Sequence, residues 1–238
     1  MSRAPSLQEL MVASFESQMA GVYTSIPCIV VGVDLVKATV DIQPTINQRL
    51  PDGTVEQRPV ILSVPISFPA SSTAAFTFPI EVGTTGMAIF SMRDMESWIG
   101  SNGRPTTPLT DGRMDKNDAI FLPGIQPPSI TINNPQKRVL THDVHDAVLV
   151  NNIGTGFEVE VRLKANGNLI MTTSSTGKVE INCKNSVVNA SESADITAPT
   201  VTLDATNIAF FGNVTHNGDW SGTGTYTFNG VTFNTHKH

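Results

Sequence analysis

Charged side chains are scarce in this chain, and the few that occur are scattered. Only 15% of the 238 residues are charged, the formal net charge at pH 7 is −6, and no run of Lys or Arg occurs anywhere. Binding to nucleic acid needs clustered basic side chains that neutralise phosphates. The sequence therefore predicts no nucleic-acid partner.

Cysteine is almost absent as well. The two cysteines, Cys28 and Cys183, lie far apart in the sequence, so neither a disulfide framework nor a cysteine-based zinc site is indicated. No secretory signal is predicted, because Gln8 and Glu9 interrupt the stretch where its apolar region would lie. We expect a protein made in the cytoplasm with buried free thiols.

A membrane-spanning helix is not predicted either. Residues 59–80 contain no charged side chain, but four prolines and six Ser or Thr residues lie among them. Prolines at this density would break a helix in lipid. We expect a strand followed by a long, weakly polar loop.

Common catalytic signatures are also missing. Neither the G-x-S-x-G nucleophile motif nor the H-E-x-x-H zinc motif occurs. Residue spacing leaves a glycoside-hydrolase pair of carboxylates open, since its two acids need not be close in sequence. The sequence favours a protein that is not an enzyme and has no small-molecule substrate.

An amphipathic helix is predicted near the N-terminus. Residues 5–21 carry apolar side chains at helical spacing with polar ones between them. Ser6 can cap this helix, and Glu9 three residues later completes a capping box. The helix either packs on its own domain or docks on a neighbouring subunit, and amphipathicity alone does not choose between the two.

Residues 26–124 have an all-β pattern. Five strands in about a hundred residues suit a small closed barrel such as an OB-fold. The composition then changes to a stiff connector rich in Pro and Asn at residues 125–146. The expected strands are residues 27–33, 36–43, 59–67, 86–92 and 119–122.

Residues 147–238 predict strands built largely from small side chains. Residues 181–238 hold only six charged side chains against twenty-seven Ser, Thr, Asn and Gly. Short period-two runs predict strands with one buried face, and one chain of such strands buries too little surface to stand alone. We therefore expect three chains wound into an intertwined β-helix. The expected strands are residues 147–151, 156–163, 168–173, 179–183, 194–198, 201–205 and 208–210.

Two histidines occupy the last three positions. On a strand, His236 and His238 point to one face and Lys237 to the other. Two ligands from one chain are too few for a closed site, whereas three chains would supply six. An octahedral set of six imidazoles suits iron or nickel better than zinc, which prefers four ligands. The plain alternative is a mobile polar terminus.

Other chemistry-bearing residues receive structural interpretations. His142 and His145 are three apart, so on a strand they would face opposite sides, and we expect them in a solvated connector. The isolated His216 is expected at the protein surface or in a structural role. Arg93, Asp94 and Trp98 are assigned to barrel architecture or to contact with a hub protein, as an ion pair beside an indole commonly fixes a loop.

Several of these motifs resemble one known family. Residues 90–94, Trp98 and residues 118–124 resemble the N-terminal barrel of the central spike proteins of contractile-tailed bacteriophages. The C-terminal half looks like the trimeric β-helical needle of these proteins. Residues 235–238 look like the histidine pair at their iron-binding tip.

The resemblance implies an all-β homotrimeric virion protein of the tail baseplate. Its parts would be an N-terminal helical segment (1–25), an OB-fold-like attachment barrel (26–124), a connector (125–146) and a needle (147–238). The barrel would attach to the tail hub, and the needle would be driven through the host outer membrane when the sheath contracts. One iron ion per trimer would be bound by His236 and His238 of all three chains.

Two alternatives stay open. A trimeric receptor-binding tail fibre or adhesin shares a β-rich stalk of Ser, Thr and Asn. A metalloenzyme would use the terminal histidines and need an open coordination position on the metal.

Overall fold

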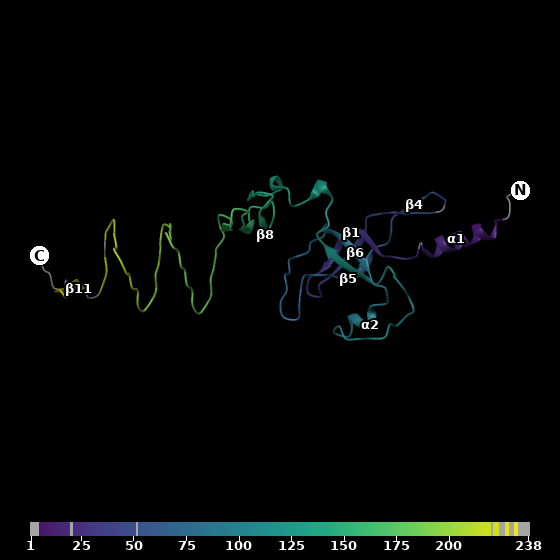
Figure 1. Ribbon diagram of the computed structural model, residues 1–238, viewed down its shortest axis with the longest axis horizontal. Helices are drawn as coiled ribbons and strands as arrows, with labels where there is room; N and C mark the ends of the chain where they lie inside the picture. The colour runs from purple at the N-terminus through teal and green to yellow at the C-terminus, as the bar shows by residue number, and fades with distance from the viewer. Residues whose placement is uncertain are drawn as a thin grey trace. The chain divides into compact units, whose positions relative to one another are not determined.

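The computed structural model describes residues 5–19, 21–50, 52–219, 221–223, 227–228 and 231–232. The chain divides into two units, residues 1–180 and residues 181–238. The described part is mostly β, with one longer helix near the N-terminus (Figure 1). None of its helices has the length and apolar character that crossing a membrane requires.

Helix α1 (Leu7–Met19) confirms the predicted N-terminal helix. The capping box is present: the Glu9 N–H donates to Ser6 Oγ at 3.2 Å, and the Ser6 N–H donates to Glu9 Oε2 at 2.6 Å. No residue of α1 is buried, and Leu7 is 75% exposed. The helix therefore does not pack on its own domain within this chain.

A five-stranded antiparallel sheet forms the centre of the first unit, in the order β5-β2-β1-β6-β7. The five predicted strands are all present. Residues 35–38 form a turn instead of the start of a strand, because Asp34 Oδ1 accepts from the N–H groups of Val36 and Lys37 and Ala38 has a φ of 54°. The strands are β1 (Ser25–Asp34), β2 (Thr39–Pro44), β5 (Ile61–Pro65), β6 (Thr85–Phe90) and β7 (Ala119–Pro123). The short elements between them are β3 (Gln48–Arg49), β4 (Val55–Glu56) and α2 (Glu96–Ile99).

This sheet curls until its two edges approach one another, which makes a half-barrel. Ile66, just after β5, forms an isolated parallel bridge with Phe121 in β7. The N–H of Ser67 donates to the Phe121 carbonyl at 2.8 Å. Gly86 permits the close packing of β6 on β7, since a Cβ there would lie 2.4 Å from the Phe121 ring.

The concave side of the half-barrel holds the hydrophobic core. Alternate residues of β1 and β2 are buried, as period-two side-chain placement requires. Cys28 lies in this core, and burial raises its pKa to about 11. Cys183 is exposed, so the prediction of buried thiols is correct only for Cys28. The core consists of Ile26, Cys28, Val30, Val40, Ile42, Ile61, Val64, Ile80, Ala88, Phe90, Ala119 and Phe121.

Residues 66–80 form the expected loop after β5. Phe78 packs edge-on against Phe68, with ring centroids 5.3 Å apart, and also contacts Phe76 at 5.8 Å. This aromatic cluster joins the uncharged segment to the main core, because Phe68 packs against that core, while Phe76 and Phe78 stay exposed.

A second, three-stranded antiparallel sheet follows the connector, which contains the short 3-10 helices η1 (Pro128–Ile130) and η2 (Pro135–Lys137). Its strands are β8 (Ala147–Asn151), β9 (Val159–Leu163) and β10 (Leu169–Thr172), in the order β10-β9-β8. The three strands predicted between residues 147 and 173 are therefore confirmed, with β9 starting later than expected.

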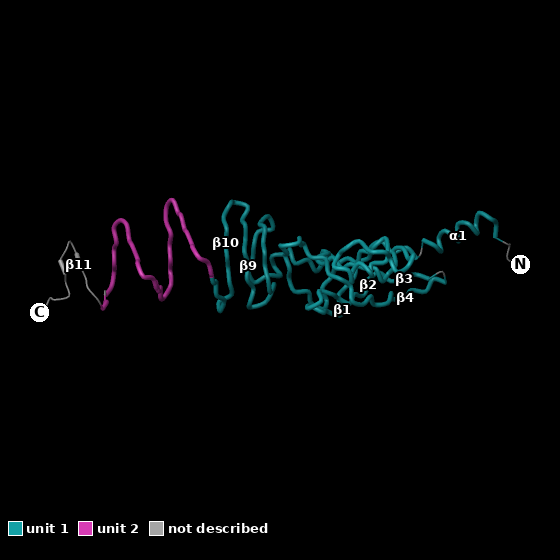
Figure 2. The backbone as a smooth tube through the Cα atoms, turned by 90° about the horizontal axis from the view of Figure 1, so that it is seen from below, with its two compact units in different colours: residues 1–180 teal, residues 181–238 magenta. Residues whose placement is uncertain are grey.

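The second unit has little regular structure. Figure 2 shows residues 181–219 as long extended stretches that turn back on themselves. Its strands in the described residues are β11 (Thr227–Phe228) and β12 (Val231–Thr232), which pair with one another. The strands predicted at 179–183, 194–198, 201–205 and 208–210 do not form in the described residues, where no second strand makes a ladder with them. The predicted β-helix is thus not shown.

Candidate functional site

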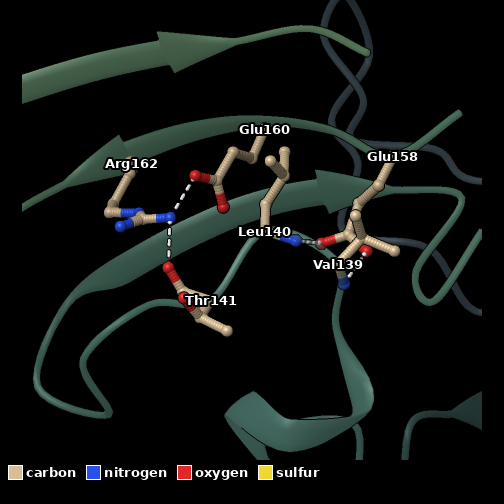
Figure 3. Close-up of polar contacts among 6 residues, drawn as sticks. All are labelled: Val139, Leu140, Thr141, Glu158, Glu160 and Arg162. Carbon is tan, nitrogen blue, oxygen red and sulfur yellow. Dashed lines mark hydrogen bonds and ion pairs between the residues drawn. The ribbon is translucent and has the colours of Figure 1, made fainter. Parts of the chain in front are cut away.

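Glu158 fastens the connector to the second sheet. Its carboxylate is buried and accepts backbone hydrogen bonds from Val139 at 2.9 Å and from Leu140 at 3.3 Å (Figure 3). A third backbone hydrogen bond comes from Gly154 at 2.9 Å. Burial raises the pKa of Glu158, but these three donors and the charge of Arg138 outweigh it and hold the pKa below its ordinary value. The side chain is therefore ionised at neutral pH and holds the connector in place.

A buried ion pair lies next to this contact. Glu160 Oε1 pairs with Arg162 Nη2, and their side chains are only 1% and 14% exposed. The same Arg162 nitrogen donates to the Thr141 carbonyl at 2.9 Å, so it reaches from β9 to the connector (Figure 3). Burying charges is costly unless they are paired, and this pair is half satisfied, because Glu160 Oε2 and Arg162 Nε have no hydrogen-bond partner.

The two connector histidines have different environments. His142 is buried, and its Nδ1 has no hydrogen-bond partner, so the prediction that it lies in a solvated connector is wrong. It is covered because the connector is held against β9. His145 is exposed, as predicted, and its Nδ1 lies 2.7 Å from Asp143 Oδ1. His142 and Arg162 help to line an open pocket of about 360 Å³.

The two faces of the second sheet differ in charge and in exposure. Residues paired across antiparallel strands place their side chains on the same face. Val148, Arg162 and Ile170 are paired in this way, and so are Val150, Glu160 and Thr172. This is the face that carries the buried ion pair. The opposite face, here called the apolar face, carries Leu149, Val159, Val161, Leu163, Leu169 and Met171, together with Ala147 and Asn151.

Within the described residues, the apolar face carries no charged side chain and most of its side chains are exposed. Leu149 is 52% exposed, Leu163 56% and Leu169 61%. A contiguous apolar patch of this kind usually marks an interaction surface.

Residues 184–214, here called the extended segment, also leave their apolar side chains exposed. No described residue in this range takes part in a backbone–backbone hydrogen bond. Ile196 is 78% exposed and Val188 80%. Extended backbone with unpaired N–H and C=O groups is a template for pairing with another chain.

Arg93, Asp94 and Trp98 do not form the expected ion pair beside an indole. Asp94 Oδ1 accepts from the Glu96 N–H at 2.9 Å, and Oδ2 accepts from the N–H and hydroxyl of Thr110. These bonds, with that to Glu96 first, hold the pKa of Asp94 below its ordinary value. Trp98 is 47% exposed. Asp94 thus helps to fix the loop without an ion pair to Arg93, which agrees with an architectural role.

The predicted metal ligands, His236 and His238, lie outside the residues that the structure describes. His216 is exposed, and its Nε2 lies 3.2 Å from the Asp219 carbonyl oxygen. Within the described ranges, no group of three or more His, Cys, Asp or Glu side chains is placed to hold a metal ion.

Sequence reasoning missed the contacts of Glu158, Glu160 and Arg162. A signal for them exists, because these residues alternate with Val159 and Val161. Period-two placement puts the three charged side chains on one face and the valines on the other. The sequence does not show which of the two faces the connector covers.

Part of the chain matches a known protein family. No curated protein sequence matches the chain. Residues 26–124, less than half of the chain, match the family model for the phage protein Gp138 N-terminal domain. The half-barrel and the loops between its strands are therefore similar to a domain of a phage protein, and this similarity favours a structural role in a bacteriophage.

Proposed function

We propose that this chain is the central tail spike of a contractile phage baseplate. In this proposal three copies wind their C-terminal halves into one needle, which punctures the host outer membrane when the sheath contracts. The half-barrel closes into an OB-fold-like attachment domain on the tail hub. The role is mechanical and needs no catalytic residues.

One observation carries this proposal. Residues 184–214 present exposed apolar side chains and unpaired extended backbone, and they follow a domain of the phage Gp138 type in the same chain. Three parallel copies would give each backbone its hydrogen-bonded neighbours and each apolar side chain its cover. A phage protein with an attachment domain and a self-assembling, narrow distal part fits a spike.

The metal at the tip forms a separate part of the proposal. His236 and His238 would supply two imidazoles per chain, and three chains would bind one iron ion with six. Such an ion ties the three chain ends together where the mechanical load is greatest. Its binding adds to trimer stability, since separated chains cannot assemble the site.

Elemental analysis of the purified protein tests the proposed tip. We expect one iron per three chains, with metal lost in the double variant His236→Ala/His238→Ala and retained in the control His216→Ala. One metal per chain, or iron that survives the double substitution, would contradict the tip. Saturable binding to a purified surface glycan would instead indicate a receptor-binding fibre.

A further inference from the structure

We propose that the apolar face of the second sheet is the core of the trimer at the base of the needle. This inference rests on the proposed function, and it assigns the interface to particular residues. Three copies of the sheet would turn Leu149, Leu163 and Leu169 toward a common axis. The polar face and the connector would form the outer wall.

The distribution of charge in the sheet supports this orientation. In most sheets with one wet face the buried side is apolar and the outer side is polar. Here Glu160 and Arg162 are buried beneath the connector, whereas the apolar face carries no charged side chain. The connector thus covers the face that carries Glu160 and Arg162, although charged side chains are costly to bury. It leaves open the apolar face, whose burial would stabilise the protein more.

The open edges of the sheet favour a second copy over an unrelated partner. Within the described residues, β8 and β10 each have β9 as their one hydrogen-bonded neighbour. A ring of identical sheets can place the β8 edge of one copy beside the β10 edge of the next, and such a head-to-tail contact closes when its rotation fits the ring. The same contact covers the apolar face and both edges.

The segment that follows β10 also favours a second copy of this chain as the partner that covers the apolar face. After β10 the sequence continues into residues 184–214, where apolar residues such as Ile196 and Leu203 stay exposed and the backbone stays unpaired. A globular partner could cover the sheet, but it would not follow this extended segment. A parallel copy of the same chain can cover both the sheet and the extended segment, because equivalent residues then lie side by side along the whole contact.

Thiol labelling of the full chain tests the inference. In a Cys183→Ser background, with Cys28 buried, Leu149→Cys places a probe on the apolar face. The matched control is Leu109→Cys, since Leu109 is 65% exposed and lies in the loop between α2 and β7 of the half-barrel. We expect a water-soluble maleimide to react at position 149 about tenfold or more slowly than at position 109.

The mass of the same samples separates the possible outcomes. A trimer with position 149 protected supports the inference. A trimer in which both positions react at similar rates overturns the inference and leaves the proposed spike standing. A single-chain mass overturns both. In a second variant, Leu149→Asp should reduce the trimer to single chains while Leu109→Asp does not, and an intact trimer for Leu149→Asp counts against the inference.

Discussion

The half-barrel and the extended segment carry similar alternating patterns of apolar residues, but only the half-barrel buries them. In β2, Val40 and Ile42 are at most 1% exposed, because neighbouring strands of the same chain cover them. In the extended segment, Ile196 and Leu203 alternate with polar residues and remain 78% and 62% exposed. The same alternating pattern therefore produces a buried core where neighbouring strands of the chain cover it. It leaves an exposed apolar surface where the described part of the chain supplies no such strands.

The largest effect is expected from a substitution in the core of the half-barrel. Phe121 is fully buried, and we expect Phe121→Ala to lower the free energy of unfolding of the half-barrel by about 3–5 kcal/mol through the cavity it leaves. Chemical denaturation would measure this loss. Val36→Ala is the control, because Val36 is 98% exposed and its truncation should change the stability by at most about 0.5 kcal/mol. Similar losses for both variants would contradict a core centred on Phe121.

The second prediction asks whether the extended segment is covered in the assembled protein. A carboxylate at Ile196 would be buried without a partner, so we expect Ile196→Asp to destabilise the assembly by about 3 kcal/mol per chain. Thr197→Asp is the matched control, since Thr197 faces the opposite side of an extended backbone. Thermal unfolding of both variants measures the difference, and equal, negligible shifts would mean that nothing covers Ile196.

The third prediction concerns the junction between connector and second sheet. Glu158→Gln keeps the shape of the side chain but replaces one of the two acceptor oxygens by an NH2 group. The backbone N–H groups that bonded to that oxygen then face another donor and lose their hydrogen bonds. Hydrogen bonds to an ionised group are strong, so we expect a local loss of about 2 kcal/mol, or roughly 30-fold faster amide exchange at Val139 and Leu140. Glu56→Gln, at the exposed strand β4, should leave these amides unchanged.

Acid should reproduce the effect of this substitution. The folded-state pKa of Glu158 lies below its ordinary value, so its stabilisation is complete above the ordinary pKa and is lost as the pH falls through the lowered one. We expect Val139 and Leu140 to lose protection in that acidic window in the natural protein, and Glu158→Gln to remove this pH dependence. An unchanged pH profile in the variant would assign the transition to another group.

The smallest effect is expected at helix α1. Ser6→Ala removes the cap that the Glu9 N–H uses, and such a loss costs about 1 kcal/mol of local helix stability. Because α1 buries no residue, the unfolding of the half-barrel should not change. Ser14→Ala in the same helix should raise helicity instead. Circular dichroism and denaturation measure the two effects, and coupled loss of helix and half-barrel would contradict the independence of α1.

Sequence reasoning found the elements whose partners are local. The five strands of the half-barrel, the capping box of Ser6 and Glu9, and the individual strands β8, β9 and β10 all follow from nearby patterns. It failed where the outcome depends on long-range contacts. The burial of His142 depends on Glu158 and Arg162 holding the connector. The strands predicted after residue 178 do not form in the described residues, and in the proposed spike their neighbours would come from other copies of the chain.

The most direct test of the central claim is the mass of the full-length protein in solution, measured by light scattering at several concentrations. An assembly in which three copies complete the extended segment predicts three times the chain mass of 25.5 kDa. A mass of 25.5 kDa at all concentrations would contradict it, because the exposed apolar residues would then have no partner.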